Sequence, residues 1–303
     1  MIRIAGAPIS WGVCEVPGWG YQLPADRVLA EMRELGLTAT EFGPDGYLPA
    51  DPAERAAILK AHDLAAAGGF VPLVLHDPDI DPEQDVDKAL DGFGNADQTA
   101  GQTAGQTADQ ATDRTVLVLA AATGADGYEG RPGLDTSQWS TLLANLDRAA
   151  ARAAERGFPA TLHPHVGTMV ETRDDVYRVL DGSDIPLCLD TGHLLIGGTD
   201  PADIARQAAG RIGHVHLKDV RERVAQQVTS GAISYTDGVR AGLYQPLGQG
   251  DVDVPAVVTA LNASDYQGWY VLEQDTILPG PARPGEGPVI QVRQSLGYLN
   301  GLL

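Results

Sequence analysis

The chain has 303 residues and carries 21 Lys and Arg against 41 Asp and Glu, which gives a formal net charge of −20. Hydrophobic residues make up 43% of the chain and charged residues 20%, so it can bury a sizeable core. Proteins that bind nucleic acid or anionic membranes need a basic surface, so the charge argues against both partners. The length fits two ordinary domains or one large α/β barrel.

The cysteines and the N-terminus predict a cytoplasmic protein. Cys14 and Cys188 are far apart in the sequence and belong to no CxxC pattern, so we expect reduced thiols rather than a disulfide framework. The N-terminal residues begin directly with a strand-like run and show no charged-then-apolar leader. No apolar run reaches the roughly 18 residues that a membrane span needs.

Short apolar runs with β-branched residues alternate with longer Ala-, Leu- and Arg-rich stretches of helical period. The predicted strands cover residues 2–7, 38–42, 72–76, 115–119, 160–163, 186–190, 212–217 and 269–273. The predicted helices cover residues 25–35, 52–67, 83–90 and onward, 138–156, 173–180, 201–209, 254–261 and 289–299.

Eight strands that alternate with eight helices predict a parallel α/β sheet, and eight is the number that closes a barrel. An open doubly wound sheet would instead favour a glycine-rich phosphate loop after the first strand. Residues 6–12 read GAPISWG and contain no GxGxxG pattern. We therefore predict an α/β fold, a single (β/α)8 TIM barrel that forms one domain over residues 1–303.

Two segments depart from this alternation. Residues 98–110 repeat units of Gln, Thr and Ala, and we expect a low-complexity surface insertion near residues 95–113. Residues 229–250, between the seventh predicted strand and its helix, are long and rich in glycine. Long loops after barrel strands usually sit over the active site, so this segment is the better candidate for a lid.

Six of the seven histidines lie at or just past the C-terminal end of a predicted strand, the end that carries the active site in a (β/α)8 barrel. These six are His76, His163, His165, His193, His214 and His216. Four carboxylates join them at the ends of strands two, three, six and eight: Glu41, Asp77, Asp190 and Glu273. This concentration on one rim predicts a site that needs imidazoles.

Period-two alternation puts His163 and His165 on one face of strand five, and His214, His216 and Lys218 on one face of strand seven. Imidazole and carboxylate groups on adjacent strand ends suit a divalent transition metal ion. Since no thiolate belongs to the set, a structural zinc site is not expected. A single strand histidine is more often a core residue than a ligand, and His214, deeper in its strand, is expected to support a ligand or the substrate.

Six sequence blocks then carry a resemblance. They are residues 7–12 (APISWG), 40–47 (TEFGPDGY), 163–168 (HPHVGT), 190–194 (DTGHL), 214–219 (HVHLKD) and 268–273 (GWYVLE). In this order they resemble the xylose-isomerase-like TIM-barrel superfamily of sugar phosphate isomerases and epimerases, and within it the inosose dehydratases and their relatives. The blocks span almost the whole chain.

The resemblance implies a divalent metal ion, with Mn²⁺ or Co²⁺ preferred over Zn²⁺, Mg²⁺ or Fe²⁺. In this superfamily Glu, Asp, His and Glu at the ends of strands five to eight hold the ion. Carried over by position, Asp190, His216 and Glu273 supply three ligands. His163 stands where the isomerases have the glutamate of strand five, and the dehydratase branch also has histidines there.

The resemblance thus implies a lyase that removes water from a cyclic, inosose-like polyhydroxy ketone, and a small polyol or ketose as the partner. A neutral imidazole suits removal of the α-proton. The expected catalytic residues are His165, His193, Glu273 and Lys218. The expected substrate contacts are Trp11, Glu41, His76, His214 and Asp219.

Alternatives remain open at this point. A metal-dependent ketose isomerase or epimerase of the same superfamily differs mainly in the residue at position 163. An endonuclease on the same barrel is disfavoured by the charge of −20. A non-catalytic sugar-binding protein would keep the fold without the ion, and a homo-oligomer is compatible with any of these functions.

Overall fold

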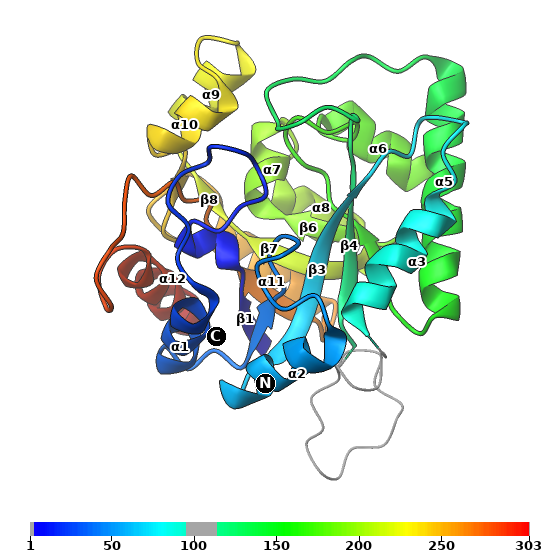
Figure 1. The fold of residues 1–303 in the computed structure, drawn as a ribbon. Helices are drawn as coiled ribbons and strands as arrows, with labels where there is room; N and C mark the ends of the chain where they lie inside the picture. The colour runs from blue at the N-terminus through cyan, green and yellow to red at the C-terminus, as the bar shows by residue number, and fades with distance from the viewer. Residues whose placement is uncertain (1–2, 95–113, 303) are drawn as a thin grey trace.

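Eight parallel strands form a closed barrel at the centre of the molecule, in the order β1–β10–β7–β6–β5–β4–β3–β2 (Figure 1). The computed structural model describes residues 3–94 and 114–302. The barrel strands are β1 (Arg3–Gly6), β2 (Ala39–Glu41), β3 (Ala65–Leu73), β4 (Val116–Ala121), β5 (Ala160–Leu162), β6 (Leu187–Asp190), β7 (Ile212–Leu217) and β10 (Trp269–Leu272). The predicted (β/α)8 barrel is therefore confirmed.

Helices surround the barrel and return the chain to the start of each next strand. They are α1 (Ala25–Glu34), α2 (Pro52–Ala61), α3 (Pro82–Phe93), α5 (Thr136–Glu155), α6 (Arg173–Gly182), α7 (Thr191–Ile196), α8 (Pro201–Gln207), α9 (Glu222–Thr229), α10 (Tyr235–Arg240), α11 (Val254–Ala263) and α12 (Pro288–Leu302). The short 3₁₀ helices are η1 (Pro8–Trp11) and η3 (Ala209–Arg211). A separate antiparallel pair joins β8 (Asp219–Val220) to β9 (Tyr244–Gln245).

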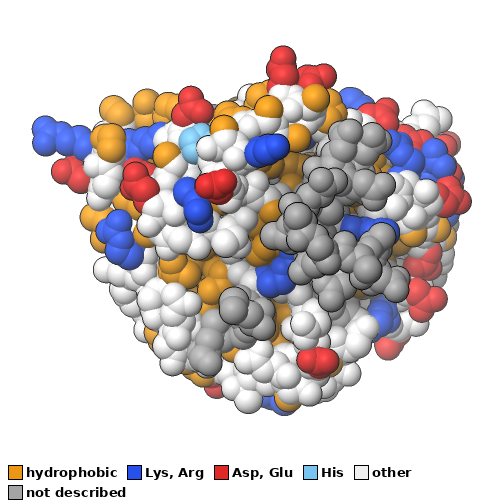
Figure 2. All heavy atoms as spheres, turned by 90° about the horizontal axis from the view of Figure 1, so that it is seen from below, with side chains coloured by type: hydrophobic (Ala, Val, Ile, Leu, Met, Phe, Trp, Pro, Cys, Tyr) orange, Lys and Arg blue, Asp and Glu red, His pale blue; other side chains and the backbone are white. Residues whose placement is uncertain are grey.

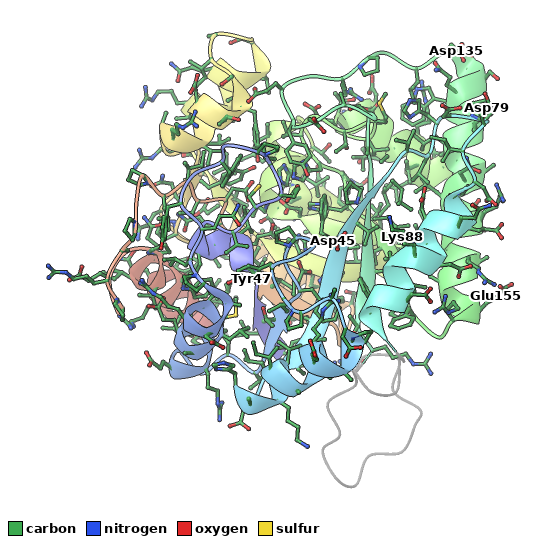
Figure 3. All side chains as sticks on the ribbon, viewed as in Figure 1. Asp45, Tyr47, Asp79, Lys88, Asp135 and Glu155 are labelled. Atoms are coloured by element: carbon green, nitrogen blue, oxygen red, sulfur yellow. The ribbon has the colours of Figure 1, made fainter. Side chains whose placement is uncertain are left out.

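The helix starts follow from local sequence chemistry. Asp51 and Asp200 each accept backbone N–H groups of the first turn, ahead of a proline at the first helical position. Asp135 forms a capping box with Gln138 at the start of α5. Figure 3 shows α5 running from Asp135 down to Glu155, antiparallel to the strands that it covers.

The prediction for the third strand was wrong. The sequence pattern placed it at residues 72–76, but β3 spans Ala65–Leu73, and the preceding helix ends at Ala61 rather than at residue 67. Asp63 adopts a positive φ of 52°, a conformation that stops the helix. The run Ala65–Gly69 resembles helix in composition, yet its small residues suit a crowded barrel wall, because a Cβ at Gly69 would lie 2.4 Å from the Phe93 ring.

The two unusual segments differ in outcome. The predicted insertion at residues 95–113 lies outside the described residues. The segment at residues 229–250 contains two short elements, α10 and β9. Tyr235 of α10 lines the central cavity, so this segment does contribute to the site, although its action as a lid remains a prediction.

One face of the molecule carries charged side chains of both signs. Seen from below, the face at the N-terminal ends of the strands carries Lys and Arg side chains interspersed with Asp and Glu (Figure 2). Within residues 3–94 and 114–302, no helix combines the length and the apolar character that a membrane crossing requires. On one flank, Arg152 of α5 and Arg156, the C-cap residue of that helix, both pair with Asp87 of α3 at 2.8 Å.

Candidate active site

A cavity of about 520 Å³ opens at the C-terminal ends of the barrel strands. Its polar lining includes Glu15, Glu41, His163, His165, His216, Lys218, Tyr235, Glu273 and Asp275. Its apolar lining includes Ile9, Val13, Trp19, Phe42, Phe70, Pro72 and Phe93. The predicted location of the site, at this rim of the barrel, agrees with the position of the cavity.

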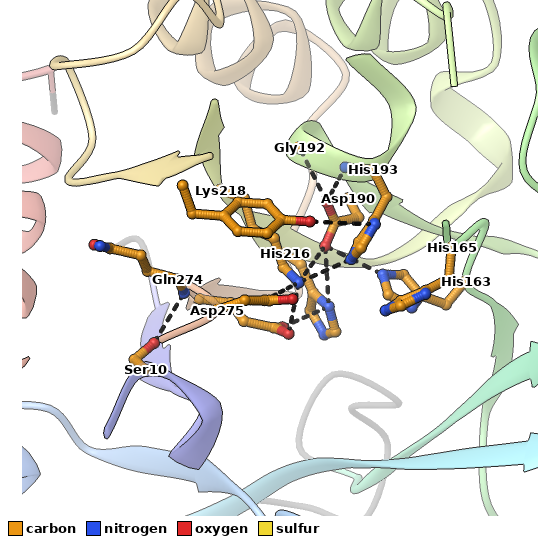
Figure 4. A network of polar contacts seen from close by, with 12 residues as sticks. Ser10, His163, His165, Asp190, Gly192, His193, His216, Lys218, Gln274 and Asp275 are labelled. Atoms are coloured by element: carbon orange, nitrogen blue, oxygen red, sulfur yellow. Dashed lines mark hydrogen bonds and ion pairs between the residues drawn. The ribbon is translucent and has the colours of Figure 1, made fainter. Parts of the chain in front are cut away.

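The four residues predicted to hold a metal ion lie next to one another, and Figure 4 labels three of them, His163, Asp190 and His216. His163 Nε2 is 3.1 Å from Asp190 Oδ2, and His216 Nδ1 is 3.6 Å from the same oxygen. His216 Nδ1 is also 2.7 Å from Glu273 Oε2. One ligand atom each from Asp190, His216 and Glu273 lies within 4.8 Å of the others. His163 contacts this three-residue group through Asp190 Oδ2.

The donor set fits a divalent cation. Asp190 Oδ1 accepts the backbone N–H groups of Gly192 and His193, which fixes the carboxylate and aims Oδ2 at the other ligands. His216 Nδ1 and Glu273 Oε2 are buried and lie 2.7 Å apart, a contact that needs a proton or a cation between the two atoms. A divalent ion bound by both atoms would meet that need.

A thiol also approaches this group. One ligand atom each of His163, Cys188 and His216 lies within 4.8 Å of the others. Burial raises the pKa of the Cys188 thiol to about 11, so it remains protonated at neutral pH. Because metals bind the thiolate and not the thiol, Cys188 is a weak candidate ligand. The period-two pattern of β6 could have indicated its position, since it lies two residues before Asp190.

Lys218 is a buried cation that neutralises the acids of the site. Its Nζ lies 3.0 Å from Glu273 Oε1, 2.7 Å from Asp275 Oδ1, 3.0 Å from His193 Nε2 and 3.6 Å from Asp190 Oδ2. Burial lowers the pKa of the ammonium group, but the surrounding carboxylates outweigh it and raise the pKa well above its usual value. Lys218 is therefore charged and fixed in place by its acceptors.

His165 and His193 stack beside the metal-competent group, with ring centroids 3.7 Å apart. His165 Nδ1 lies 2.7 Å from the carbonyl oxygen of Val166, so Nδ1 carries the proton and Nε2 keeps its lone pair. Burial lowers the pKa of both imidazoles well below the usual value, so both are neutral. His165 lines the cavity, whereas His193 lies behind it against Lys218.

Several cavity residues were not predicted from the sequence. Asp275 accepts hydrogen bonds from Lys218 Nζ and from the Tyr235 hydroxyl, each at 2.7 Å. The Tyr128 ring lies 4.4 Å from the His165 ring, and its hydroxyl donates to Glu15. Asp275 could have been found, because it lies two residues after Glu273 on the same strand extension. Nothing in the sequence singled out Tyr128.

Three residues predicted to contact substrate are placed elsewhere. Trp11 is fully buried and its indole Nε1 donates to Glu31 Oε2 at 2.8 Å, away from the cavity. The Asp219 carboxylate is occupied by backbone N–H groups of Val220, Gly248, Gly250 and Val252, so it organises the following loop. His76 follows the end of β3 by three residues and is not part of the cavity lining.

The two remaining predicted contacts form a pair. His214 Nε2 and His216 Nε2 lie 2.8 and 2.9 Å from the same oxygen, Glu41 Oε1. Glu41 lines the cavity, whereas His214 lies behind it and is fully buried. His214 therefore supports Glu41 rather than reaching a bound substrate, as expected for a histidine deeper in its strand.

Comparison with known proteins agrees with this geometry. A family model described as the xylose isomerase-like TIM barrel matches residues 29–296. The chain belongs to this family. Curated relatives of the chain are named as inosose dehydratases and as a rhizopine catabolism protein.

Two curated relatives cover most of the chain. The chain is 32% identical to the rhizopine catabolism protein MocC of Rhizobium meliloti, over 93% of this chain and 84% of that protein. It is 30% identical to the inosose dehydratase of Geobacillus kaustophilus, over 90% of this chain and 87% of that protein. These similarities support an enzyme of this superfamily.

Solved structures share the fold at low sequence identity. The probable 3-DHS dehydratase AsbF of Bacillus anthracis superposes with a TM-score of 0.67 at 16% identity, covering 99% of both chains. The IolI protein with a bound zinc atom superposes with a TM-score of 0.65 at 14% identity, covering 99% of this chain and 98% of that one. These likenesses support the barrel architecture.

Proposed function

We propose that the protein is a divalent-metal-dependent dehydratase of an inosose-like cyclic polyhydroxy ketone. One observation carries the proposal: His165 presents an imidazole with a free Nε2 to the cavity, beside the group formed by Asp190, His216 and Glu273. The similarity to inosose dehydratases supports the same reaction. An ion held by Asp190, His216, Glu273 and His163 would polarise the ketone oxygen and stabilise the enolate charge.

The residues around that ion have distinct tasks. His165 Nε2 removes the proton from the carbon next to the ketone, and the electron pair of the broken C–H bond passes into the enolate. The enolate then re-forms its C=O bond, its double bond moves to lie between the α- and β-carbons, and the C–O bond to the β-hydroxyl breaks; this hydroxyl takes the proton from the His165 imidazolium and leaves as water. His165 is the single imidazole outside the proposed ligand set in the described cavity lining, which favours one base and a syn elimination.

Lys218 and Asp275 act around this step. The Lys218 ammonium group lies at the cavity and balances the negative charge that develops on the enolate. Asp275 and His193 fix the ammonium group by accepting its hydrogen bonds. His193 thus keeps a role in orienting Lys218 and His165.

A ketose 3-epimerase is the second candidate, supported by the fold of D-allulose 3-epimerase from Methylomonas sp., with a TM-score of 0.66 and 17% identity. An epimerase needs proton exchange on two faces of the substrate, which two acids usually perform. Here His163 stands in place of one of these acids. Glu41, across the barrel, is occupied by two imidazoles. The residues of this site therefore support the dehydratase function better than the epimerase function.

The two functions are separated by an assay in D₂O. Metal-loaded protein is incubated with scyllo-inosose and, separately, with ketohexoses, and the products are followed by NMR. We expect inosose to lose water and the ketohexoses to show no solvent deuterium uptake. Deuterium exchange into a ketose without any dehydration of inosose would contradict the proposal and favour the epimerase.

We further propose that the protein works in the cytoplasm on a small-molecule substrate. Cys14 and Cys188 are both free and buried, as suits a reducing compartment. Fractionation of the host cell, with the protein detected by antibody, tests this proposal, and recovery in an extracytoplasmic fraction would contradict it.

A further inference from the structure

Glu41 is a buried carboxylate whose contacts are imidazoles. It lies at the end of β2 and is 5% exposed. Its Oε1 is 2.8 Å from His214 Nε2 and 2.9 Å from His216 Nε2, both on β7, which is separated from β2 by β1 and β10 in the closed barrel. A carboxylate is costly to bury, so a protein that buries one usually uses it.

The barrel wall is shaped for this side chain. The register between β2 and β3 shifts between Thr40 and Glu41, and such irregularities re-aim a side chain near active sites. Glu41 pairs with Gly68 of β3, and a Cβ on Gly68 would lie 3.1 Å from Glu41 Oε1. Glycine at position 68 therefore leaves the space in which Glu41 turns toward β7.

The contact with Glu41 determines which nitrogen of His216 is free. An ionised carboxylate only accepts hydrogen bonds, so His216 Nε2 must carry the proton that it donates to Glu41 Oε1. When an ion binds at Nδ1, the imidazole keeps its one proton on Nε2 and offers the Nδ1 lone pair to the ion. This Nδ1 is buried and lies 2.7 Å from Glu273 Oε2, a contact that needs a proton or a cation between the two atoms.

We propose that Glu41 is a positioning residue that selects the tautomer of His216 and orients its Nδ1 toward the metal ion, rather than a residue that binds substrate hydroxyls. The arrangement is a carboxylate–histidine–metal relay, in which the carboxylate makes the histidine a stronger ligand. His214 donates to the same oxygen and keeps Glu41 in place. The inference rests on the proposed ion at Asp190, His216 and Glu273.

A different use of the same atoms is a second ion held by Glu41, His214 and His216, whose ligand atoms also lie within 4.8 Å of one another. That ion would displace the proton on His216 Nε2, and the imidazole would bridge two metals. The two arrangements differ in the number of ions bound per chain and in the proton on Nε2, and both quantities can be measured.

The variant that tests the proposal is Glu41→Gln, which keeps the size of the side chain and removes its charge. Mn²⁺ binding is titrated by electron paramagnetic resonance in the wild type and the variant. We expect one ion per wild-type chain and a dissociation constant about 10- to 100-fold higher in the variant. Glu31→Gln is the matched control, because Glu31 is 3% exposed and contacts Trp11 and Arg27 outside the barrel; its Mn²⁺ affinity should equal that of the wild type.

A measurement on the wild type keeps the proposal testable if Glu41→Gln does not fold. In protein labelled with ¹⁵N-histidine and loaded with Zn²⁺, we expect His216 to show a proton on Nε2 and metal-shifted Nδ1. Unchanged Mn²⁺ affinity in Glu41→Gln, two ions per wild-type chain, or an unprotonated Nε2 would each overturn this inference while leaving the proposed function standing. A wild type that binds no ion would overturn both.

Discussion

The two halves of the barrel rim differ in what they offer the cavity. The half formed by β5, β6, β7 and β10 contributes imidazoles, carboxylates and one buried ammonium group. The half formed by β1 to β4 contributes mainly apolar side chains such as Ile9, Phe42 and Phe70. Under the proposed function the first half would supply the chemistry and the second half the shape of the cavity, and Glu41 of the second half contacts His216 of the first.

The largest effect is expected in the chemical half, from Glu273→Gln. Loss of this carboxylate removes a proposed metal ligand and one acceptor of Lys218. Dehydration of inosose should fall by about 10⁴-fold, because the electrostatic role of the ion is worth several kcal/mol. Turnover and bound metal by elemental analysis are measured together, with the exposed Glu286→Gln as the control. Wild-type metal content in Glu273→Gln would remove Glu273 from the ligand set.

His165→Gln should affect the chemistry without affecting the ion. The imidazole that faces the cavity is lost, while Asp190, His216 and Glu273 stay in place. We expect kcat for dehydration to fall by about 10³-fold and the Mn²⁺ dissociation constant to change little. Steady-state kinetics beside a Mn²⁺ titration separates the two quantities. Near-normal kcat would show that another group is the base.

Lys218→Met should affect the stability of the metal-free protein. The variant leaves Asp190, Glu273 and Asp275 without their shared cation, and uncompensated buried charge costs about 3 kcal/mol. We expect Tm in the presence of a chelator to fall by about 5 °C or more. Added Mn²⁺ should raise Tm more in the variant than in the wild type, since the ion replaces part of the missing charge. An equal rise in both proteins would refute this account of Lys218.

The smallest effect is expected in the shape half, from Phe70→Leu. Phe70 lies on β3 with its ring 5.8 Å from that of His163. The smaller side chain loses roughly 1 kcal/mol of apolar contact, so KM should rise about fivefold while Mn²⁺ affinity is unchanged. Kinetics and titration check both. A loss of Mn²⁺ affinity would show that this half does more than shape the cavity.

The same division explains how much the sequence could predict. Apolar β-branched runs were decisive for strands such as β7, whose predicted bounds, 212–217, are those of Ile212–Leu217. They failed for β3, because its first half is made of Ala and Gly that pack closely in the wall. Short strands with clear alternation are predictable from local pattern, whereas a wall built of small residues is fixed by tertiary packing.

For the candidate site too, local pattern predicted some residues, whereas contacts distant in sequence decided others. The alternation expected at the ends of β5 and β7 predicted that His163, His165, His216 and Lys218 would meet. All four line the cavity, although His163, His165 and Lys218 lie just past the ends of their strands. Trp11 and Asp219 were predicted as substrate contacts from their places beside strand ends, but their roles depend on partners distant in sequence, Glu31 and the loop that ends at Val252. Such pairings leave no local signal.

The most direct test of the account compares dehydration of scyllo-inosose by metal-free and Mn²⁺-loaded protein, with product formation followed by NMR. We predict that water is lost only in the presence of the ion and that chelation abolishes the reaction reversibly. Equal dehydration by both preparations, or none by either, would contradict the central claim that a divalent ion held by Asp190, His216 and Glu273 drives this reaction.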